Sequence, residues 1–132
     1  MIVIDTSALV AMLANEVQGP ACRSVFETED QIFISAGTVL EALIVATRRG
    51  FRSEMRELIA DPSMSIVPVT EARAELASVA YAQWGKSFHK ASLNFGDCFA
   101  YATAKEFDCP LLYVGDDFAR TDIKSAIAPS VA

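Results

Sequence analysis

The sequence predicts an α/β fold in which helices flank a short, mainly parallel sheet. Short apolar segments rich in β-branched residues alternate with segments of helical periodicity along the whole chain, which is the pattern of repeated βαβ units. The first of these segments, residues 2–4, is apolar at every position, as expected for a strand that is buried on both faces. No linker, repeat or low-complexity stretch interrupts the 132 residues, so we expect a single domain over residues 1–132.

Each element is predicted from its own local pattern. Short apolar runs predict strands at residues 2–4, 31–34, 65–69 and 111–114, with a further edge strand near residues 126–128. Apolar positions at helical spacing predict helices at residues 7–13, 38–49, 51–60, 70–84 and 94–107. Gly50 is expected to end one of these helices, and Asp61 followed by Pro62 to end the next.

The helix predicted over residues 38–49 carries apolar residues on almost every side. A helix of this composition is usually covered on more than one face. A partner chain is one candidate for that cover, and we therefore expect a homodimer.

The balance of charges is acidic. Asp and Glu number 17 against 11 Lys and Arg, a formal net charge of -6, and the pI is near 4.7. Hydrophobic residues make up 52% and the mean hydropathy is +0.30, which excludes the disordered class. The acidic balance argues against a protein that coats nucleic acid by bulk positive charge.

The cysteines and the N-terminus favour a cytoplasmic protein with no membrane anchor. Cys22, Cys98 and Cys109 are an odd number without Cys-x-x-Cys spacing, so they suggest neither a disulfide framework nor a zinc site. The N-terminus lacks a basic region, and the apolar run over residues 8–14 is too short to span a bilayer.

Several acidic residues stand at the ends of the predicted elements. Asp5 directly follows the first strand, and Asp116 and Asp117 follow the fourth. The carboxyl ends of parallel strands border the ligand crevice of an open sheet. Glu41 and Asp97 stand in the first turns of two predicted helices, so four segments each offer a carboxylate to one site.

Helix capping is the alternative interpretation of these acids. Thr38 with Glu41 has the spacing of a capping box, and Asn94 with Asp97 resembles one. Asp5 also stands where a helix cap is expected, as do the acids after the fourth strand. Taken singly, each acid fits capping at least as well as catalysis, and only the joint pattern favours a site.

Periodicity along residues 94–107 separates two helix faces. Phe95, Phe99 and Ala102 share one side, whereas Asp97 and Tyr101 share the opposite one. We therefore expect the side of Phe95 to face the core and Asp97 to lie away from it.

A cluster of carboxylates without Lys or Arg partners would raise the pKa of some members through mutual repulsion. A divalent cation removes that repulsion. Because the candidate ligands are all carboxylate oxygens, we expect Mg²⁺, with Mn²⁺ as the alternative.

The same residues resemble a known family. The segment IVIDTSAL at residues 2–9, Glu41, the segment LNFGDCFAYA at residues 93–102, and LLYVGDDF at residues 111–118 followed by TDI are together similar to PIN domains. More closely, they resemble the VapC toxins of bacterial toxin-antitoxin pairs. The resemblance implies a PIN-like three-layer α/β sandwich and a metal-dependent endoribonuclease that inhibits translation and growth when free of its antitoxin. It also implies a VapB-like antitoxin partner, in a heterotetramer or larger assembly.

The resemblance assigns roles to the acids. Asp5 and Asp97 match the principal metal ligands, and Glu41 matches the third acid. Asp117 is favoured over Asp116 as the fourth. The remaining positions that it marks are Asp122 as an outer-shell acid, with Ser7 and Thr121 in support.

Basic residues near these segments are candidates for holding RNA phosphates, although a solvated surface explains them equally well. They are Arg48, Arg49, Arg52, Lys86 and Lys90. The runner-up function is a catalytically inactive PIN-like module that binds RNA or protein without cutting. Four retained acids argue against it, because an inactive site has no electrostatic reason to keep them together.

Overall fold

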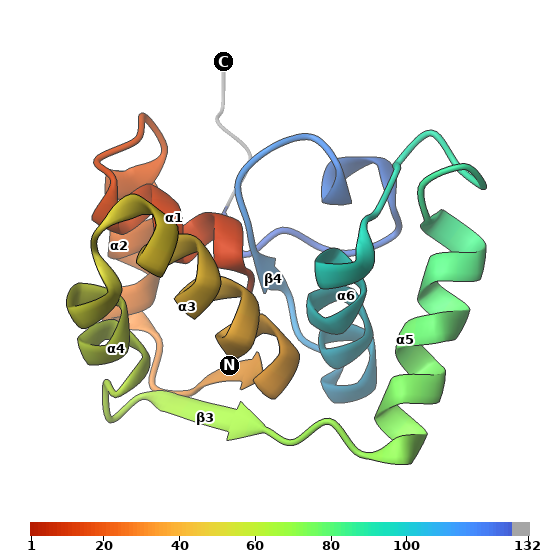
Figure 1. Cartoon of the computed structure of the whole chain (residues 1–132), viewed down its shortest axis with the longest axis horizontal. Coiled ribbons are helices and arrows are strands. Elements are labelled where there is room, and N and C mark those ends of the chain that lie inside the picture. The colour runs from red at the N-terminus through yellow and green to blue at the C-terminus, as the bar shows by residue number, and fades with distance from the viewer. Residues whose placement is uncertain (128–132) are drawn as a thin grey trace.

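A four-stranded parallel sheet separates two helical layers in the structure, a computed structural model that describes residues 1–127 (Figure 1). The strands are β1 (Ile2–Ile4), β2 (Ile32–Ser35), β3 (Met64–Val67) and β4 (Leu111–Leu112). They lie in the order β3-β2-β1-β4, and every neighbouring pair is parallel. The predicted α/β class with a short parallel sheet is confirmed.

The helices of the described residues cover both faces of this sheet. They are α1 (Thr6–Leu13), α2 (Gly19–Thr28), α3 (Ala36–Arg49), α4 (Arg52–Ile59), α5 (Glu71–Trp84) and α6 (Phe95–Phe107). Helices α1 to α4 pack together as one layer, whereas α6 packs on the other face of the sheet with α5 outside it (Figure 1). A 3-10 helix, η1 (Phe118–Arg120), follows β4.

The central strand β1 contributes to both hydrophobic cores. Ile2 and Ile4 are buried in the core shared with α1 to α4, and Val3 is buried in the core shared with α5 and α6. Successive side chains of a strand point to opposite faces, so a strand between two helical layers is apolar at every position. This explains the first pattern seen in the sequence.

Helix α2 was not expected, because no element was assigned between residues 14 and 30. It is polar along most of its length, and Cys22 and Phe26 are its main buried side chains. Pro20 stands in its first turn, where a missing backbone N–H is tolerated.

Strand β4 is two residues shorter than expected, and the final edge strand is reduced to a single bridge. The backbone N–H of Val114 donates to the hydroxyl of Ser7 (3.0 Å), so the chain leaves the sheet before residue 114. Ser125 forms a parallel bridge with Leu111. Ala128, the end of the predicted edge strand, lies outside the described residues.

Helix α3 begins earlier than expected and has a different cap. Ser35 caps it, because its hydroxyl accepts a hydrogen bond from the backbone N–H of Gly37 (3.1 Å). The capping box predicted for Thr38 and Glu41 is therefore wrong. Gly50 ends the helix with a φ of 84°, as predicted, since that left-handed conformation favours glycine.

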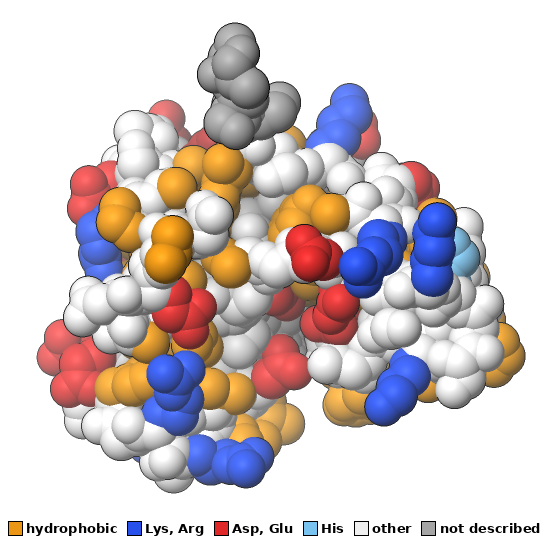
Figure 2. Space-filling model, turned by 90° about the horizontal axis from the view of Figure 1, so that it is seen from above, with side chains coloured by type: hydrophobic (Ala, Val, Ile, Leu, Met, Phe, Trp, Pro, Cys, Tyr) orange, Lys and Arg blue, Asp and Glu red, His pale blue; other side chains and the backbone are white. Residues whose placement is uncertain are grey.

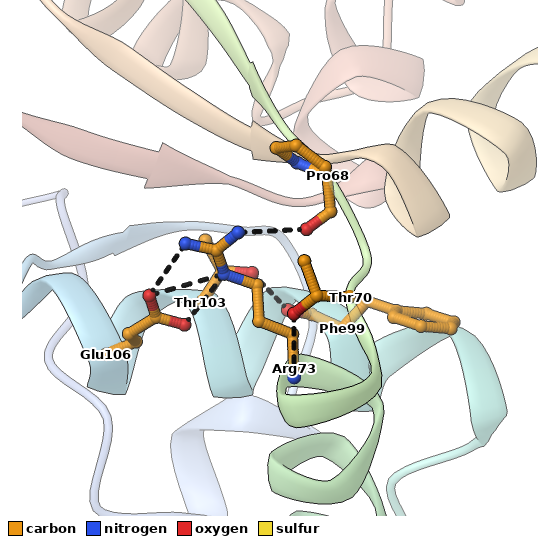
Figure 3. Close-up of polar contacts among 6 residues, drawn as sticks. All are labelled: Pro68, Thr70, Arg73, Phe99, Thr103 and Glu106. Carbon is orange, nitrogen blue, oxygen red and sulfur yellow. Dashed lines mark hydrogen bonds and ion pairs between the residues drawn. The ribbon is translucent and has the colours of Figure 1, made fainter.

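Arg73 fastens α5 to α6 (Figure 3). Its guanidinium donates to both carboxylate oxygens of Glu106 (3.0 to 3.3 Å) and to the carbonyl of Pro68 (3.1 Å). This bidentate ion pair joins the two helices. The hydrogen bond to Pro68 also attaches the segment after β3 to α5.

The three cysteines are free and buried, as expected of small core residues. Among residues 1–127, no helix is both long and apolar enough to cross a membrane.

The strand order changes direction at β1. The chain passes from β1 to β2 and β3 on one side, and later places β4 on the other side of β1. Such a change of direction leaves a gap at the carboxyl ends of the two strands. Asp5 follows β1 and Asp116 and Asp117 follow β4, so these acids come after the carboxyl ends of the two strands at this point.

Candidate functional site

Asp5 is a buried carboxylate with one satisfied oxygen. It caps α1, and its Oδ2 accepts hydrogen bonds from the backbone N–H (3.0 Å) and the hydroxyl (2.6 Å) of Ser7. Its Oδ1 is buried and has no hydrogen-bond partner within residues 1–127. A charged oxygen in that position is costly unless a ligand compensates it.

The surroundings of Asp5 favour its protonated form. Burial raises its pKa to about 7, and the charges of Asp97 and Glu41 add to the rise, although the hydrogen bonds from Ser7 oppose it. The same Ser7 hydroxyl accepts from the backbone N–H of Val114. Ser7 therefore links the end of β4 to the carboxylate that follows β1.

Glu41 reaches the site from α3 through a close contact with α6. Its Oε1 accepts a hydrogen bond from the hydroxyl of Thr6 (2.6 Å). Its carboxylate also lies against Gly96, where even an added methyl group would collide with it. Thr6 and Gly96 were not predicted as site residues. The glycine directly before Asp97 was the available signal, since glycine often marks a close approach.

Asp97 is held by the predicted capping box at the start of α6. Its Oδ2 accepts from the backbone N–H of Asn94 (2.9 Å), and its own N–H donates to the side chain of Asn94 (2.9 Å). Burial raises its pKa to about 6, with added contributions from the charges of Glu41 and Asp117. Asp97 therefore both takes part in the cap of α6 and belongs to the acidic cluster.

Asp117 is the acid after β4 that lies nearest this cluster in electrostatic terms. Both Asp116 and Asp117 are exposed, but only Asp117 contributes to the raised pKa of Asp97. Gly115 precedes them with a φ of 104°, a conformation that L side chains rarely adopt.

Asp122 and Thr121 lie in a different environment. Asp122 accepts from the hydroxyl of Tyr101 (2.5 Å) and from the ammonium of Lys105 (2.9 Å), and the Tyr101 bond in particular lowers its pKa. Tyr101 also accepts from the indole N–H of Trp84 (2.8 Å). Thr121 donates to the carbonyl of Phe118 and shapes a local turn.

The two faces of α6 are the reverse of those expected. Tyr101 and Ala104, on the side of Asp97, are only 4% and 1% exposed, whereas Phe95 is 80% exposed. Small residues such as Gly96, Ala100 and Ala104 let α6 approach the sheet closely, whereas Phe99 on the other side is half-buried against Gly37 of α3. Asp97 therefore stands on the buried side of its helix.

The candidate phosphate contacts lie in two groups. Arg49 pairs with Glu16 (3.8 Å) and Arg52 donates to Thr47 (3.2 Å), at the far end of α3 and the start of α4. Lys86 and Lys90 lie in the loop before α6. Figure 2 shows Lys and Arg side chains on both sides of a central hollow around which acidic side chains gather.

The charges of neighbouring acids raise the pKa of Asp5 and Asp97, but in the described part of the chain the acidic side chains do not surround a metal position. Among residues 1–127, no three His, Cys, Asp or Glu side chains are arranged so that they hold a metal ion as they stand. One oxygen of Asp97 and one of Glu41 each accept a hydrogen bond from a neighbouring donor. The carboxylates are nevertheless a hard, oxygen-only donor set that suits Mg²⁺ chemistry.

Known proteins similar to this chain share its length and pattern. The PIN-domain family profile matches residues 2–124. Ribonuclease VapC30 of Mycobacterium tuberculosis is 38% identical over 130 residues, which cover 96% of this chain and 99% of that protein. Ribonuclease VapC of Mycolicibacterium smegmatis is 39% identical over 124 residues, covering 92% and 96% respectively.

Solved structures share the fold at lower identity. VapC20 of Mycobacterium tuberculosis, described as a toxin that cleaves the sarcin-ricin loop, superposes with a TM-score of 0.77 at 15% identity, covering 93% of this chain and 96% of that one. A toxin-antitoxin complex from Klebsiella pneumoniae gives 0.70 at 18% identity, with 92% and 93% covered. These similarities confirm the PIN-like sandwich.

Proposed function

The chain belongs to the PIN-domain family and, within it, to the VapC ribonucleases, and from this premise we propose how its acids carry out the hydrolysis of RNA. As a member of that family it is an endoribonuclease toxin of a toxin-antitoxin pair. We propose that it restrains translation and growth when its antitoxin is absent, and that it acts in the cytoplasm.

The buried Asp5 oxygen is the observation that carries the proposed mechanism. It has no partner within residues 1–127, its pKa is raised to about 7, and it lies near the charges of Asp97 and Glu41. A divalent cation would compensate all three carboxylates. Asp5 and Asp97 are proposed to hold Mg²⁺, or Mn²⁺ in its place, with Glu41 and Asp117 completing the site after small side-chain rotations.

When bound, Mg²⁺ stabilises negative charge on a phosphate oxygen and lowers the pKa of a bound water. The protein's own residues prepare that site. Ser7 fixes the orientation of Asp5, and Asn94 fixes Asp97 at the helix start. The hydroxyl of Thr6 fixes one oxygen of Glu41 and leaves the other beside Gly96, where it can orient a water molecule.

Positively charged side chains can bind the RNA phosphates on either side of the cleaved bond. Lys86 and Lys90 lead into α6, and they are proposed to hold the RNA backbone beside Asp97. Arg48, Arg49 and Arg52 are proposed as a more distant backbone contact. With a net charge of -6, the protein does not hold RNA by bulk charge, so these local contacts determine the register.

The proposed mechanism is tested by expressing the chain alone, beside its Asp5→Asn and Asp97→Asn variants. Wild-type protein should stop growth and cleave RNA in Mg²⁺ but not in a chelator, and both variants should lose these effects. Equal toxicity of all three would contradict the assignment of these acids. Absence of toxicity and cleavage in all three would favour the inactive RNA- or protein-binding module.

Two protein partners are proposed. The exposed apolar residues of α3, Leu40 (62% exposed) and Ile44 (49%), support a homodimer, and a VapB-like antitoxin completes a heterotetramer or larger assembly. Light scattering at high micromolar concentration should give a dimer for wild type and a monomer for a Leu40→Glu, Ile44→Glu variant. A wild-type monomer would contradict the proposed dimer.

A further inference from the structure

Phe95 is an aromatic side chain exposed in an unusual place. It is the first residue of α6, two positions before Asp97, and 80% of its surface is open. Large apolar side chains are normally buried or reserved for a partner. Phe95 therefore presents an apolar surface at the start of the helix that carries Asp97.

The ring of Phe95 is held in place from beneath. It packs edge-to-face on Phe99, with ring centroids 5.2 Å apart and an interplanar angle of 88°. Phe99 is itself confined by α3, because a methyl group on Gly37 would lie only 2.6 Å from its ring. Figure 3 shows the Phe99 ring directed away from the pair formed by Arg73 and Glu106. Phe95 is therefore a fixed aromatic surface, without the freedom of an unsupported side chain.

A groove of about 670 Å³ runs beside this ring. Phe95, Phe99 and Tyr81 contribute aromatic lining, and Lys86 and Asn94 contribute polar groups. The groove thus combines a flat apolar surface with one cation, within one helical turn of Asp97. An unpaired nucleotide has the same two features, a flat base and an adjacent phosphate.

We propose that Phe95 is the platform on which an unpaired base stacks next to the cleaved phosphate, while Lys86 contacts a neighbouring phosphate. This rests on the proposed ribonuclease function and names a residue that selects the substrate. Stacking on an aromatic ring tolerates every base but requires that the base be unpaired. An acidic enzyme with weak bulk attraction for RNA would in this way prefer single-stranded positions.

Protein-protein contact is the competing use of this surface. The presence of Lys86 and Asn94 in the lining beside Phe95 favours RNA, because an ammonium there can meet the phosphate of a nucleotide whose base stacks on the ring. Leu76 (47% exposed) and Val79 (55%) lie on α5 outside the groove of Phe95, in a separate pocket whose lysine, Lys105, is already paired with Asp122 (2.9 Å). These two exposed apolar residues are the better candidates for a protein contact.

The test uses RNA binding in the Asp5→Asn background, which blocks cleavage without touching α6. A single-stranded oligoribonucleotide carries 2-aminopurine at successive positions, and its fluorescence reports stacking. Quenching should occur at one position, and Phe95→Ala should remove it and weaken binding about 10-fold. Phe95→Tyr should restore both, whereas Leu76→Ala should change neither.

Other outcomes would overturn this proposal. Equal quenching and affinity in Phe95→Ala would show that the ring does not stack on RNA. Loss of the dimer in light scattering, with RNA quenching unchanged, would assign Phe95 to a protein interface. If wild type fails to cleave RNA in Mg²⁺ but the quenching still depends on Phe95, then the stacking proposal stands and the proposed catalysis fails.

Discussion

Asp97 and Asp122 are two carboxylates beside the same helix in opposite electrostatic situations. Burial and the charges of Glu41 and Asp117 raise the pKa of Asp97 to about 6. Tyr101 and Lys105 satisfy both oxygens of Asp122 and lower its pKa. The two acids therefore differ in their partners: positively charged and hydroxyl groups of the fold compensate Asp122, whereas Asp97 has, within residues 1–127, only the backbone N–H of Asn94.

The same contrast extends to Asp5 and Glu106. Glu106 is paired on both oxygens with Arg73, whereas Asp5 keeps one buried oxygen without a partner among residues 1–127. Glu106 and Asp122 both stand in charge-assisted pairs, with Arg73 and Lys105. Acids left unpaired in the interior reduce stability, and they are retained where a ligand uses them.

The largest expected effect is on catalysis. Asp97→Asn keeps the capping box, because the amide oxygen still accepts from Asn94, but it removes the charge. We expect RNA cleavage to fall by about 100-fold or more, in the range seen when one electrostatic contact to a transition state is removed. Asp122→Asn is the matched control and should leave the rate near the wild-type value. A comparable loss of RNA cleavage in both variants would show that the two acids do not differ in their roles.

The next effect is on the pH dependence of stability without metal. The native-state pKa of Asp5 lies near 7, above its ordinary 3.8, so the native state binds more protons than the unfolded state between these values. This stabilisation is full below about pH 4 and is lost as the pH rises through 7, by an amount on the order of 2–4 kcal/mol. Asp97 acts in the same direction up to about pH 6.

Chemical denaturation in a chelator at pH 5 and pH 8 measures this change. Wild type should be less stable at pH 8, and Asp5→Asn should show a smaller loss between the two values. Asp122, with its lowered pKa, works in the opposite direction, and its stabilisation is lost in acid below about pH 4. A wild-type stability that does not fall between pH 5 and 8 would contradict the assigned state of Asp5.

A smaller effect is expected from the contact between α3 and α6. Gly96→Ala places a methyl group against the Glu41 carboxylate, so Glu41 must move away from the site. We expect activity to fall about 10-fold or more, because small displacements of catalytic groups are costly. Adding Gly96→Ala to a Glu41→Ala variant should cause little further loss, and a fully additive loss would show that the two residues act separately.

The smallest effect concerns the network around Asp122. Tyr101→Phe leaves the Trp84 indole N–H and one oxygen of Asp122 without their partner. The free energy of unfolding should fall by about 1–2 kcal/mol, while cleavage persists. Tyr113→Phe is a suitable control, since that hydroxyl makes no hydrogen bond to residues 1–127. Loss of cleavage in Tyr101→Phe would connect this network to catalysis.

Local patterns in the sequence predicted the parts of the fold that depend on near neighbours. Uniform apolarity at residues 2–4 identified β1 because both its faces are buried. Asn94 and Asp97 form the predicted capping box because that motif is complete within four residues. Helix α2 was missed because most of its surface is solvated and its few buried positions make a weak periodic pattern.

Contacts between segments that are distant in the sequence could not be predicted from local patterns. The position of the Glu41 carboxylate depends on Gly96 in another helix, and no local pattern predicts that approach. The faces of α6 were assigned by the size of Phe95 and Phe99, whereas the close packing of α6 on the sheet favours small residues there. The sequence therefore marked these acids as candidates, but only the tertiary structure shows which of them are buried and what each contacts.

Calorimetric titration of Mg²⁺ is the most direct test that the unpaired acids hold a cation. It compares wild type with Asp5→Asn and Asp122→Asn at pH 7.5 in the absence of RNA. Wild type and Asp122→Asn should bind Mg²⁺ with similar affinity, and Asp5→Asn should bind at least about 10-fold more weakly. Equal binding by all three proteins, or no binding by wild type, would contradict the account.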